Sequence, residues 1–471
     1  MNVTVLKAML LSATFSLVQA MPAAAQATDA SVFDFSLPGA RSRGMGGAFV
    51  AIADDASSVY SNPAGLTSLF RPEVSIEGRI WNLRFNTVDR GHAFGSPTNV
   101  GVDTISGLRD REFSNTIGAP AFLSAVYPSG RWAVGLFHHR LVNFDMLHEI
   151  QGPFFDCRGG GRGANGAPPF CEQGNASDGV DRVFPYRRDL QLGITSTGLT
   201  VALRATERLK LGVSAQVLRF DLHSSDLVYA ARFERKYAAA DWSAENLEIA
   251  GVRMGKDGGL GFNAGVLWDV SAELTIGATF RQGEEFKYLS QSVAGRANTE
   301  GAGTMFLNEP NTSFRVPDTW AAGIAVKPNN SWRIGFEYDR IQYRQLLDTY
   351  INTTIPDTWP EARIMREHIT VDSSNQFRLG AEYSRPAFGG RLLSFRGGAW
   401  IDPFHHPYFK VTDQATGFPA PQWSLTLPKG EDEMHYSGGV GTATQRRLQI
   451  DFAVDHARSV TTYSLSSIVR F

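Results

Sequence analysis

Residues 332–339 read WRIGFEYD, and every second side chain in this stretch is apolar. One face carries Trp332, Ile334, Phe336 and Tyr338, and the other carries Arg333, Gly335, Glu337 and Asp339. A period of two residues is typical of a β-strand with one apolar and one polar face. The same alternation recurs at 274–281, 377–383 and 448–455. The apolar face points to the core of a soluble sandwich or to the lipid around a membrane barrel, so alternation alone leaves both folds open.

The lengths of the connections separate these two folds. The alternating segments predict fourteen strands, at about 73–85, 121–128, 132–143, 188–204, 209–222, 260–269, 273–287, 314–327, 331–345, 376–385, 391–401, 434–445, 447–456 and 461–471. Tight turns such as 128–131 and 206–208 alternate with long connections such as 144–187 and 223–259. Short periplasmic turns and long outer loops are typical of outer-membrane barrels. The sequence therefore predicts an all-β fold, a 14-stranded antiparallel transmembrane β-barrel in the bacterial outer membrane.

The end of the chain agrees with this fold. The last predicted strand places Tyr463, Leu465, Val469 and Phe471 on one face and ends in an aromatic residue. A terminal aromatic of this kind looks like the signal by which outer-membrane barrels are inserted. We therefore expect Phe471 to be the insertion signal, with the barrel-assembly machinery and outer-membrane lipid as partners.

The composition excludes several classes of protein. The 471 residues hold 45 Lys and Arg against 47 Asp and Glu, a net charge of −2, which gives no electrostatic footprint for nucleic-acid binding. Apolar residues make up 43% of the chain, which excludes a disordered protein. A mean hydropathy of −0.18 excludes a polytopic helical membrane protein, but a barrel with a polar lumen remains compatible with it.

The N-terminus predicts export. Lys7 precedes the short apolar stretch 8–18, and small residues at 23–27 offer an A-x-A cleavage site. This arrangement is typical of a secretory signal peptide and is too short to span a bilayer as a helix. We expect residues 1–25 to be the signal peptide, and beyond it no apolar run approaches 18 residues.

The segment between the signal and the first strand is not strand-like. Asp54 and Asp55 precede a short helical stretch, and the run from Asn62 to Gly65 reads NPAG, a turn. An Asn side chain can bond backbone groups two residues on, and Pro fixes φ, so together they set one turn. The lumen of a fourteen-stranded barrel has room for a plug. Residues 26–70 are therefore predicted to form a short helical hatch in the lumen, and residues 71–471 the barrel.

The same segment carries a family resemblance. The stretches GMGGAF at 44–49, ADDAS at 53–57 and NPAGL at 62–66 resemble the N-terminal hatch of the FadL/TodX family of outer-membrane transporters of long-chain fatty acids and other hydrophobic compounds. Further similarity lies in VPDTWAAGI at 316–324, FRLGAEY at 377–383 and HYSGGVG at 435–441. The resemblance covers nearly the whole mature chain, and the hatch motif Asn62-Pro63-Ala64 is its most specific part. The GMGG stretch also resembles the PorV-like barrels that serve secretion systems.

The resemblance implies positions for the ligand. An outer apolar groove would be formed by the loops after the fifth and seventh strands, with Leu227, Phe233, Tyr237, Trp242, Leu247, Met305, Phe306 and Leu307 as candidates; packing between the loops is the alternative. A luminal site would involve Phe33, Phe35 and Leu37 from the hatch, or these residues simply pack the plug. Arg219 matches the family's basic luminal residue by position, although strict alternation with Val213 and Val217 points it outward unless a bulge intervenes. A lateral exit would lie at the third strand, near Gly135.

The sequence offers little chemistry. No G-x-S-x-G, Walker loop or H-E-x-x-H motif occurs. His435 and Ser437 share one strand face, as in a barrel phospholipase, but the sequence places no acidic partner beside them. We therefore predict no enzyme and no cofactor. The two cysteines, Cys157 and Cys171, are expected to form a disulfide in an oxidising compartment, with free thiols or a metal site as weaker alternatives.

The family resemblance implies that the function is passive transport. A long-chain fatty acid or aromatic hydrocarbon would bind the outer groove, move to the lumen and leave sideways after the hatch shifts. The chain is expected to act as a monomer. The alternative is a PorV-like barrel that binds or anchors a partner of a secretion system.

Overall fold

The structure, a computed structural model, describes residues 35–93, 95–156, 179–183, 185–229, 235–294, 305–346, 369–410, 429–444 and 447–471. Several of the predictions concern positions outside these ranges: the signal peptide, Phe33, the two cysteines Cys157 and Cys171, and Phe233. These remain predictions.

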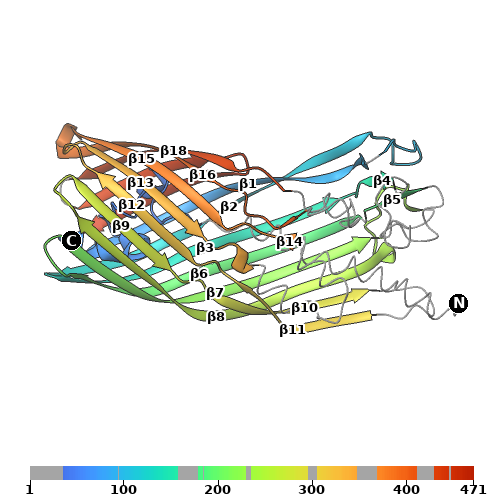
Figure 1. Ribbon diagram of the computed structural model, residues 1–471, viewed down its shortest axis with the longest axis horizontal. Coiled ribbons are helices and arrows are strands. Elements are labelled where there is room, and N and C mark those ends of the chain that lie inside the picture. Colours follow the sequence, from blue (N-terminus) through green and yellow to red (C-terminus); the bar gives the residue numbers. More distant parts are fainter. Residues whose placement is uncertain are drawn as a thin grey trace.

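The described strands form a closed antiparallel barrel of fourteen barrel strands, as predicted (Figure 1). We call each of the fourteen a stave, because some staves consist of two labelled strands. Twelve staves are single strands: β1 (Glu73–Ala93), β2 (Gly107–Ser129), β3 (Trp132–Ile150), β6 (Tyr186–Arg204), β7 (Leu209–Tyr229), β8 (Leu247–Asp269), β13 (Trp332–Ile341), β15 (Ser374–Ala387), β16 (Arg391–Asp402), β18 (Glu433–Thr444), β19 (Leu448–His456) and β20 (Val460–Arg470). Pairing of β1 with β20 closes the barrel, because it leaves no free edge at the ends of the sheet.

The other two staves are each broken in two. β9 (Leu274–Arg281) continues as β10 (Glu285–Ala294), and β11 (Met305–Arg315) continues as β12 (Thr319–Val326). The breaks lie side by side, since the Val316 amide donates to the Glu284 carbonyl at 2.8 Å and the Gly283 amide donates to Asp318 Oδ1 at 2.8 Å. Pro317 lacks an amide proton and cannot continue a ladder, which accounts for the break in its own stave.

The strands on one side of the barrel are much longer than the sequence pattern indicated. β1, β2, β3, β6, β7 and β8 have 19–23 residues each, and Figure 1 shows them reaching far beyond β13, β16 and β18. Much of the segments 86–120 and 223–259, predicted as loops, is therefore strand. The β1–β2 ladder continues to Gly91 and Leu108, through residues that are polar on both faces. Without an apolar face the period-two signal disappears, although the hydrogen bonds continue.

The two faces of the wall differ as a membrane barrel requires. Trp332, Ile334 and Phe336 are exposed on the outside, whereas Gly335 and Glu337 are buried inside. Tyr463, Leu465, Val469 and Phe471 are likewise exposed, as predicted for the last strand. Among the described residues, no helix has the length and hydrophobicity that a membrane crossing requires.

The hatch lies inside the barrel and consists of short helical turns. These are α2 (Ala40–Gly44), α3 (Ser58–Ser61) and the 3-10 helix η1 (Pro63–Ser68). Nearly every residue from Ser36 to Thr67 is buried. α2 lies against β18 and β19, whereas η1 lies against β6, β7 and β8, so the hatch crosses the lumen from one wall to the other.

Candidate functional site: the hatch and the channel lining

Asn62 joins the hatch to the wall. Its side-chain amide donates to the Val50 carbonyl in the hatch at 2.9 Å and to the Val266 carbonyl on β8 at 3.1 Å. Its Oδ1 accepts from the Ala64 amide, 3.2 Å away, and Pro63 opens η1. The predicted turn at Asn62-Pro63-Ala64 therefore forms, and it does meet the barrel wall.

Inward-facing glycines let the hatch backbone approach the wall closely. A Cβ on Gly212 would lie 2.3 Å from the Pro63 carbonyl carbon, and one on Gly398 would lie 2.3 Å from the Gly46 nitrogen. Side chains cannot fit at such distances, so these positions admit only glycine. Others that would meet hatch atoms are Gly135, Gly265, Gly277, Gly335, Gly380 and Gly439. We call these eight positions the glycine ring.

One side of the lumen is charged and binds the first part of the hatch. Arg41 donates from Nε and Nη2 to the two carboxylate oxygens of Glu382 on β15, both at 2.9 Å. Arg396 on β16 donates to the same carboxylate at 2.7 Å, and Arg41 also pairs with Asp55 at 3.1 Å. All four side chains are buried, so each charge depends on its partners for stability.

Two carboxylates of the wall bind hatch amides. Glu337 Oε2 on β13 accepts from the amides of Phe49 and Val50, at 2.8 and 2.7 Å. Glu77 Oε2 on β1 accepts from the Gly39 amide at 2.7 Å. The inward polar positions that the alternation predicted, including Glu337, therefore bind the plug and do not line an open water-filled pore.

The opposite side of the lumen is apolar. Val59, Tyr60 and Leu66 of the hatch belong to one continuous buried cluster with inward side chains of β2, β3, β6, β7 and β10, including Phe122, Phe137, Ile194, Leu218, Phe220 and Phe286. We call this surface the apolar lining. Within it the rings of Phe220 and Phe286 stack at 5.1 Å, and Tyr60 meets Phe137 edge to face at 5.5 Å. The lining reaches from the hatch to Tyr343, beyond the end of β13.

The hatch residues predicted to touch ligand occupy two different places. Phe35 packs against the apolar lining and meets the Tyr343 ring edge to face at 5.7 Å. Leu37 belongs to a separate cluster with Phe49 and Val50, inside the hatch. Phe35 therefore lies on the apolar lining, and Leu37 packs the plug.

The predicted outer-groove residues make packing contacts where they are described. Leu227 lies within β7 and Leu247 begins β8, so neither is in a loop. Tyr237 stacks on Phe154 of β4 (Phe154–Asp156) at 5.6 Å, and Trp242 meets Tyr229 edge to face at 5.0 Å. Met305, Phe306 and Leu307 begin β11, and their side chains lie outside the description. The groove itself stays a prediction.

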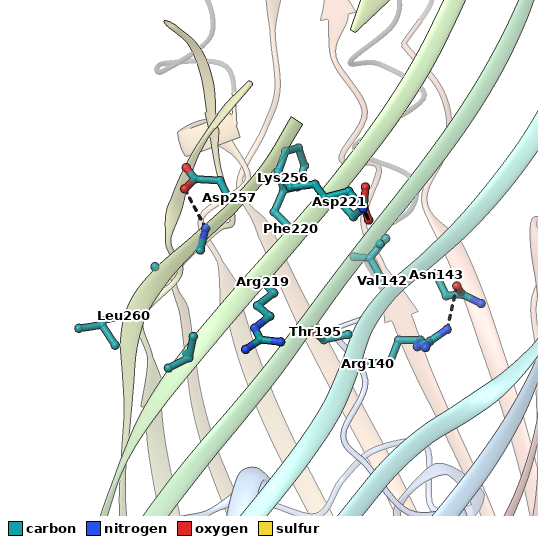
Figure 2. Close-up of a pocket in the computed structure, with 14 residues that line it drawn as sticks. Arg140, Val142, Asn143, Thr195, Arg219, Phe220, Asp221, Lys256, Asp257 and Leu260 are labelled. Carbon is teal, nitrogen blue, oxygen red and sulfur yellow. Dashed lines mark hydrogen bonds and ion pairs between the residues drawn. The ribbon is translucent and has the colours of Figure 1, made fainter. Parts of the chain in front are cut away.

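Arg219 does not face the lumen, which corrects its assignment to a luminal ligand site. The β6–β7 and β7–β8 pairing is unbroken around it, and its neighbours Leu218 and Phe220 are buried inside. Without a bulge, alternation turns Arg219 outward. It lines a depression of about 890 Å³ on the outer face, with Arg140, Thr195 and Lys256 (Figure 2).

The third stave has a bulge, which lies a few residues beyond Gly135, the predicted lateral exit. Pairing of β3 with β6 runs unbroken through Gly135 and slips between Arg140 and Val142, where Leu141 is an extra residue. Leu141 and Val142 are both buried, so the bulge switches which face points inward. Gly135 instead touches the hatch, since its Cβ would lie 2.8 Å from Val59 Cγ2.

The structure supplies an acidic partner for His435 that the sequence could not show. His435 Nδ1 lies 2.9 Å from Asp455 Oδ2, and its ring stacks on Trp400 at 3.7 Å. The buried Ser437 hydroxyl has no hydrogen-bond partner in the described part of the chain, so it makes no hydrogen bond with His435. Among the described residues no group of three or more potential metal ligands comes together.

A closed outer-membrane barrel with a bound hatch and an apolar lining defines a channel for hydrophobic compounds. The family described as outer membrane protein transport protein (OMPP1/FadL/TodX) matches residues 187–463. This chain belongs to that family, whose members are transporters of the outer membrane.

Solved structures agree on the fold. The chain is similar to a FadL homologue from Pseudomonas aeruginosa (12% identity, TM-score 0.58), to the CymD monoaromatic hydrocarbon channel (15%, 0.54) and to the Ralstonia pickettii toluene transporter TbuX (16%, 0.50). Each likeness covers 93% of this chain and 99% of the other. A search of curated protein sequences finds no significant match.

Proposed function

We propose that this protein is a passive, ligand-gated channel for long-chain fatty acids or aromatic hydrocarbons. The observation that carries the proposal is the apolar lining, which is continuous from Phe35 and Tyr343 down to Val59 and Leu66 of the hatch. A hydrophobic molecule gains about 25 cal/mol per Å² of apolar surface that it buries against such a wall. No energy source is needed for movement down a concentration gradient.

In this proposal the hatch is the gate. It is bound to the wall by ion pairs and carboxylates on the charged side, and on the other side by apolar packing together with hydrogen bonds such as those from Thr200 to the Val59 carbonyl and from Asn263 to the Tyr60 carbonyl. A ligand on the apolar lining competes with that packing and leaves the charged side in place. We therefore propose that the second half of the hatch, from Val59 to Leu66, moves first.

Lateral exit through the third stave completes the proposal. Gly135, predicted as the gate, lies beneath Val59, and the bulge at Leu141 lies six residues further along the same strand. A ligand that displaces Val59 would reach the wall at Gly135. Exit into lipid keeps the molecule out of water, which would otherwise cost about 0.8 kcal/mol per CH₂.

Uptake into liposomes tests the function. The purified protein is reconstituted, and entry of a radiolabelled long-chain fatty acid and of radiolabelled toluene is compared with that into protein-free vesicles. Phe220→Asn places an amide in the apolar lining and should slow uptake. Phe155→Asn is the matched control, because Phe155 is equally buried but packs with Ala93 in a separate cluster. Equal uptake by both variants and the wild type would overturn the proposed route. No uptake by an assembled wild-type barrel would favour the secretion-partner alternative.

A further inference from the structure

The outer depression is built from aligned positions on four neighbouring strands. Arg140 on β3 pairs with Thr195 on β6, Thr195 pairs with Arg219 on β7, and Arg219 pairs with Gly258 on β8. Figure 2 shows the Arg140 and Arg219 side chains on either side of Thr195. Adjacent strands lie about 4.8 Å apart, so the two arginine backbones are separated by about 10 Å. Both guanidinium groups can therefore reach one small anion between them.

The next row completes the depression on its outer side. Asn143, Gly193, Asp221 and Lys256 are aligned in the same way across the four strands. Gly193 has nothing within 4 Å of the place where a Cβ would stand, so the floor is open at this point. Gly193 and Gly258 have no side chains. They therefore leave open space between the cationic side chains of Arg140, Arg219 and Lys256.

The charged side chains of the depression carry a net charge of +1, because Arg140, Arg219 and Lys256 outnumber Asp221 and Asp257. Lys256 pairs with Asp221 at 2.9 Å, and the Asp257 carboxylate accepts from the amides of Gly258 and Lys287. Arg140 donates to the Asn143 amide oxygen at 3.2 Å, and its buried Nε has no partner in the described ranges. Arg219 likewise has no hydrogen-bond or ion-pair partner among the residues that the structure describes.

The depression lies immediately above the apolar outer surface. Val217 and Leu260 form the paired positions directly below Arg219 and Gly258, and Leu260 is 76% exposed. Leu136 and Leu199, also exposed, pair with each other on β3 and β6. The cationic side chains of Arg140 and Arg219 therefore lie at the level where the hydrocarbon region of the membrane ends and the lipid head groups begin.

We propose that this depression binds the phosphorylated head group of an outer-leaflet lipid. Arg140 and Arg219 would hold one phosphate from two sides, since guanidinium groups match phosphate oxygens in pairs. Thr195 offers a hydroxyl between them. The acyl chains would lie along Val217, Leu260, Leu136 and Leu199. This site is separate from the lumen and does not depend on the transported compound.

Native mass spectrometry of the full-length protein in detergent tests the proposal. The probe is lipid A with both phosphates, compared with the same lipid after enzymatic removal of its phosphates. R140Q/R219Q should weaken binding of the phosphorylated lipid by about tenfold or more, because charge-assisted hydrogen bonds are lost. It should leave the weak binding of the dephosphorylated lipid unchanged. R140K/R219K keeps the charge and should bind more tightly than the glutamine variant.

The matched control is R340Q. Arg340 lies on β13, outside the depression, and donates to Asn375 Oδ1 at 2.7 Å. Its loss should not change lipid binding. The proposal is overturned if R140Q/R219Q, still folded by its heat-dependent gel mobility, binds the phosphorylated lipid as the wild type does. Displacement of the lipid by millimolar inorganic phosphate would assign the site to a soluble anion and overturn the lipid assignment.

Discussion

The side-chain amide of Asn62 donates a hydrogen bond to the main-chain carbonyl of Val266, 204 residues further along the chain. Because Val266 lies on β8 and Asn62 precedes η1, this bond fixes the second half of the hatch to the wall. The acceptor is a main-chain carbonyl, so the contact depends on the position of the strand and not on the side chain of Val266.

The N62A/P63G variant tests the turn. Without the amide, the buried carbonyls of Val50 and Val266 lose a donor, at a cost of about 1–3 kcal/mol in hatch docking. The barrel ladder is untouched, so the variant should assemble and keep its heat-dependent gel mobility, while uptake of the hydrophobic substrate changes. Thr67→Val is the control, because Thr67 donates only within the hatch, to Ala64. Failure of N62A/P63G to assemble would make the motif structural.

The glycine ring gives a test on two adjacent residues. Gly398→Ala would place a methyl group 2.3 Å from the Gly46 nitrogen and should displace the first half of the hatch. Gly397→Ala points into open space, with nothing within 4 Å. The temperature at which the folded gel band disappears should fall for Gly398→Ala alone. Similar temperatures for both variants would mean that the hatch does not need this close approach.

Arg41→Met tests the charged side. Removal of Arg41 leaves Asp55 and part of the Glu382 charge buried without a partner, which typically costs about 3–5 kcal/mol. We expect the hatch to become sensitive to protease in the intact barrel. Arg458→Met is the control: in its pair with Glu431 both side chains are exposed, 65% and 84%, and such pairs contribute about 0–1 kcal/mol. Protease resistance equal to that of the wild type would contradict this role of Arg41.

A pH-dependent contact lies between the hatch and the outer segments. His405 stacks on Tyr343 at 4.2 Å, and Tyr343 meets Phe35. Burial opposes protonation, but the Asp402 carboxylate 3.4 Å away outweighs it and raises the pKa of His405 above 6.5. Since the raised pKa belongs to the folded state, the stabilisation is complete below about pH 6.5 and is lost as the pH rises through the raised pKa.

Hydrogen exchange measures this effect. Amides near Tyr343 and His405 should be better protected at pH 6 than at pH 8.5 after correction for the intrinsic rates. His405→Gln should remove the difference, and His456→Gln, which loses a contact to Thr461 on β20, should not. If protection near Tyr343 is the same at both pH values in the wild type, protonation of His405 does not stabilise the contact.

The sequence predicted the strands of the barrel and their two faces, but it did not predict how far the strands extend beyond the membrane. Alternation at 332–339 and 448–455 shows which side chains face lipid, because lipid selects for apolar residues at every second position. Beyond the membrane that selection stops: the outer end of β1 carries no such pattern, and in the outer half of β7 the apolar residues Phe220 and Leu222 face the lumen and not the lipid. Alternation also predicted correctly that the Arg219 side chain points outward. The match of its position to the family's basic residue predicted a luminal side chain, which was wrong.

The hatch was only partly predictable. The local turn at Asn62 follows from residue types that act within two positions. The contacts of Asn62 with Val266 and of Arg41 with Glu382 join residues that are hundreds of positions apart. A single sequence does not show which distant residues come into contact. The glycines within otherwise regular strands were the available signal, because a mid-strand glycine often marks the close approach of another backbone.

The glycine ring also fixes where along the channel the closure lies. Gly135, Gly212, Gly277 and Gly335 are each the fourth residue of their strands, counted from the short turns. The helical part of the hatch therefore closes the inner mouth, and most of the channel length lies outside it. Molecules arriving from outside can fill this length while the closure is intact. The amount of ligand in the channel should then saturate as the external ligand concentration rises. The rate of transport should be limited by release of the ligand past the hatch and not by its capture from outside.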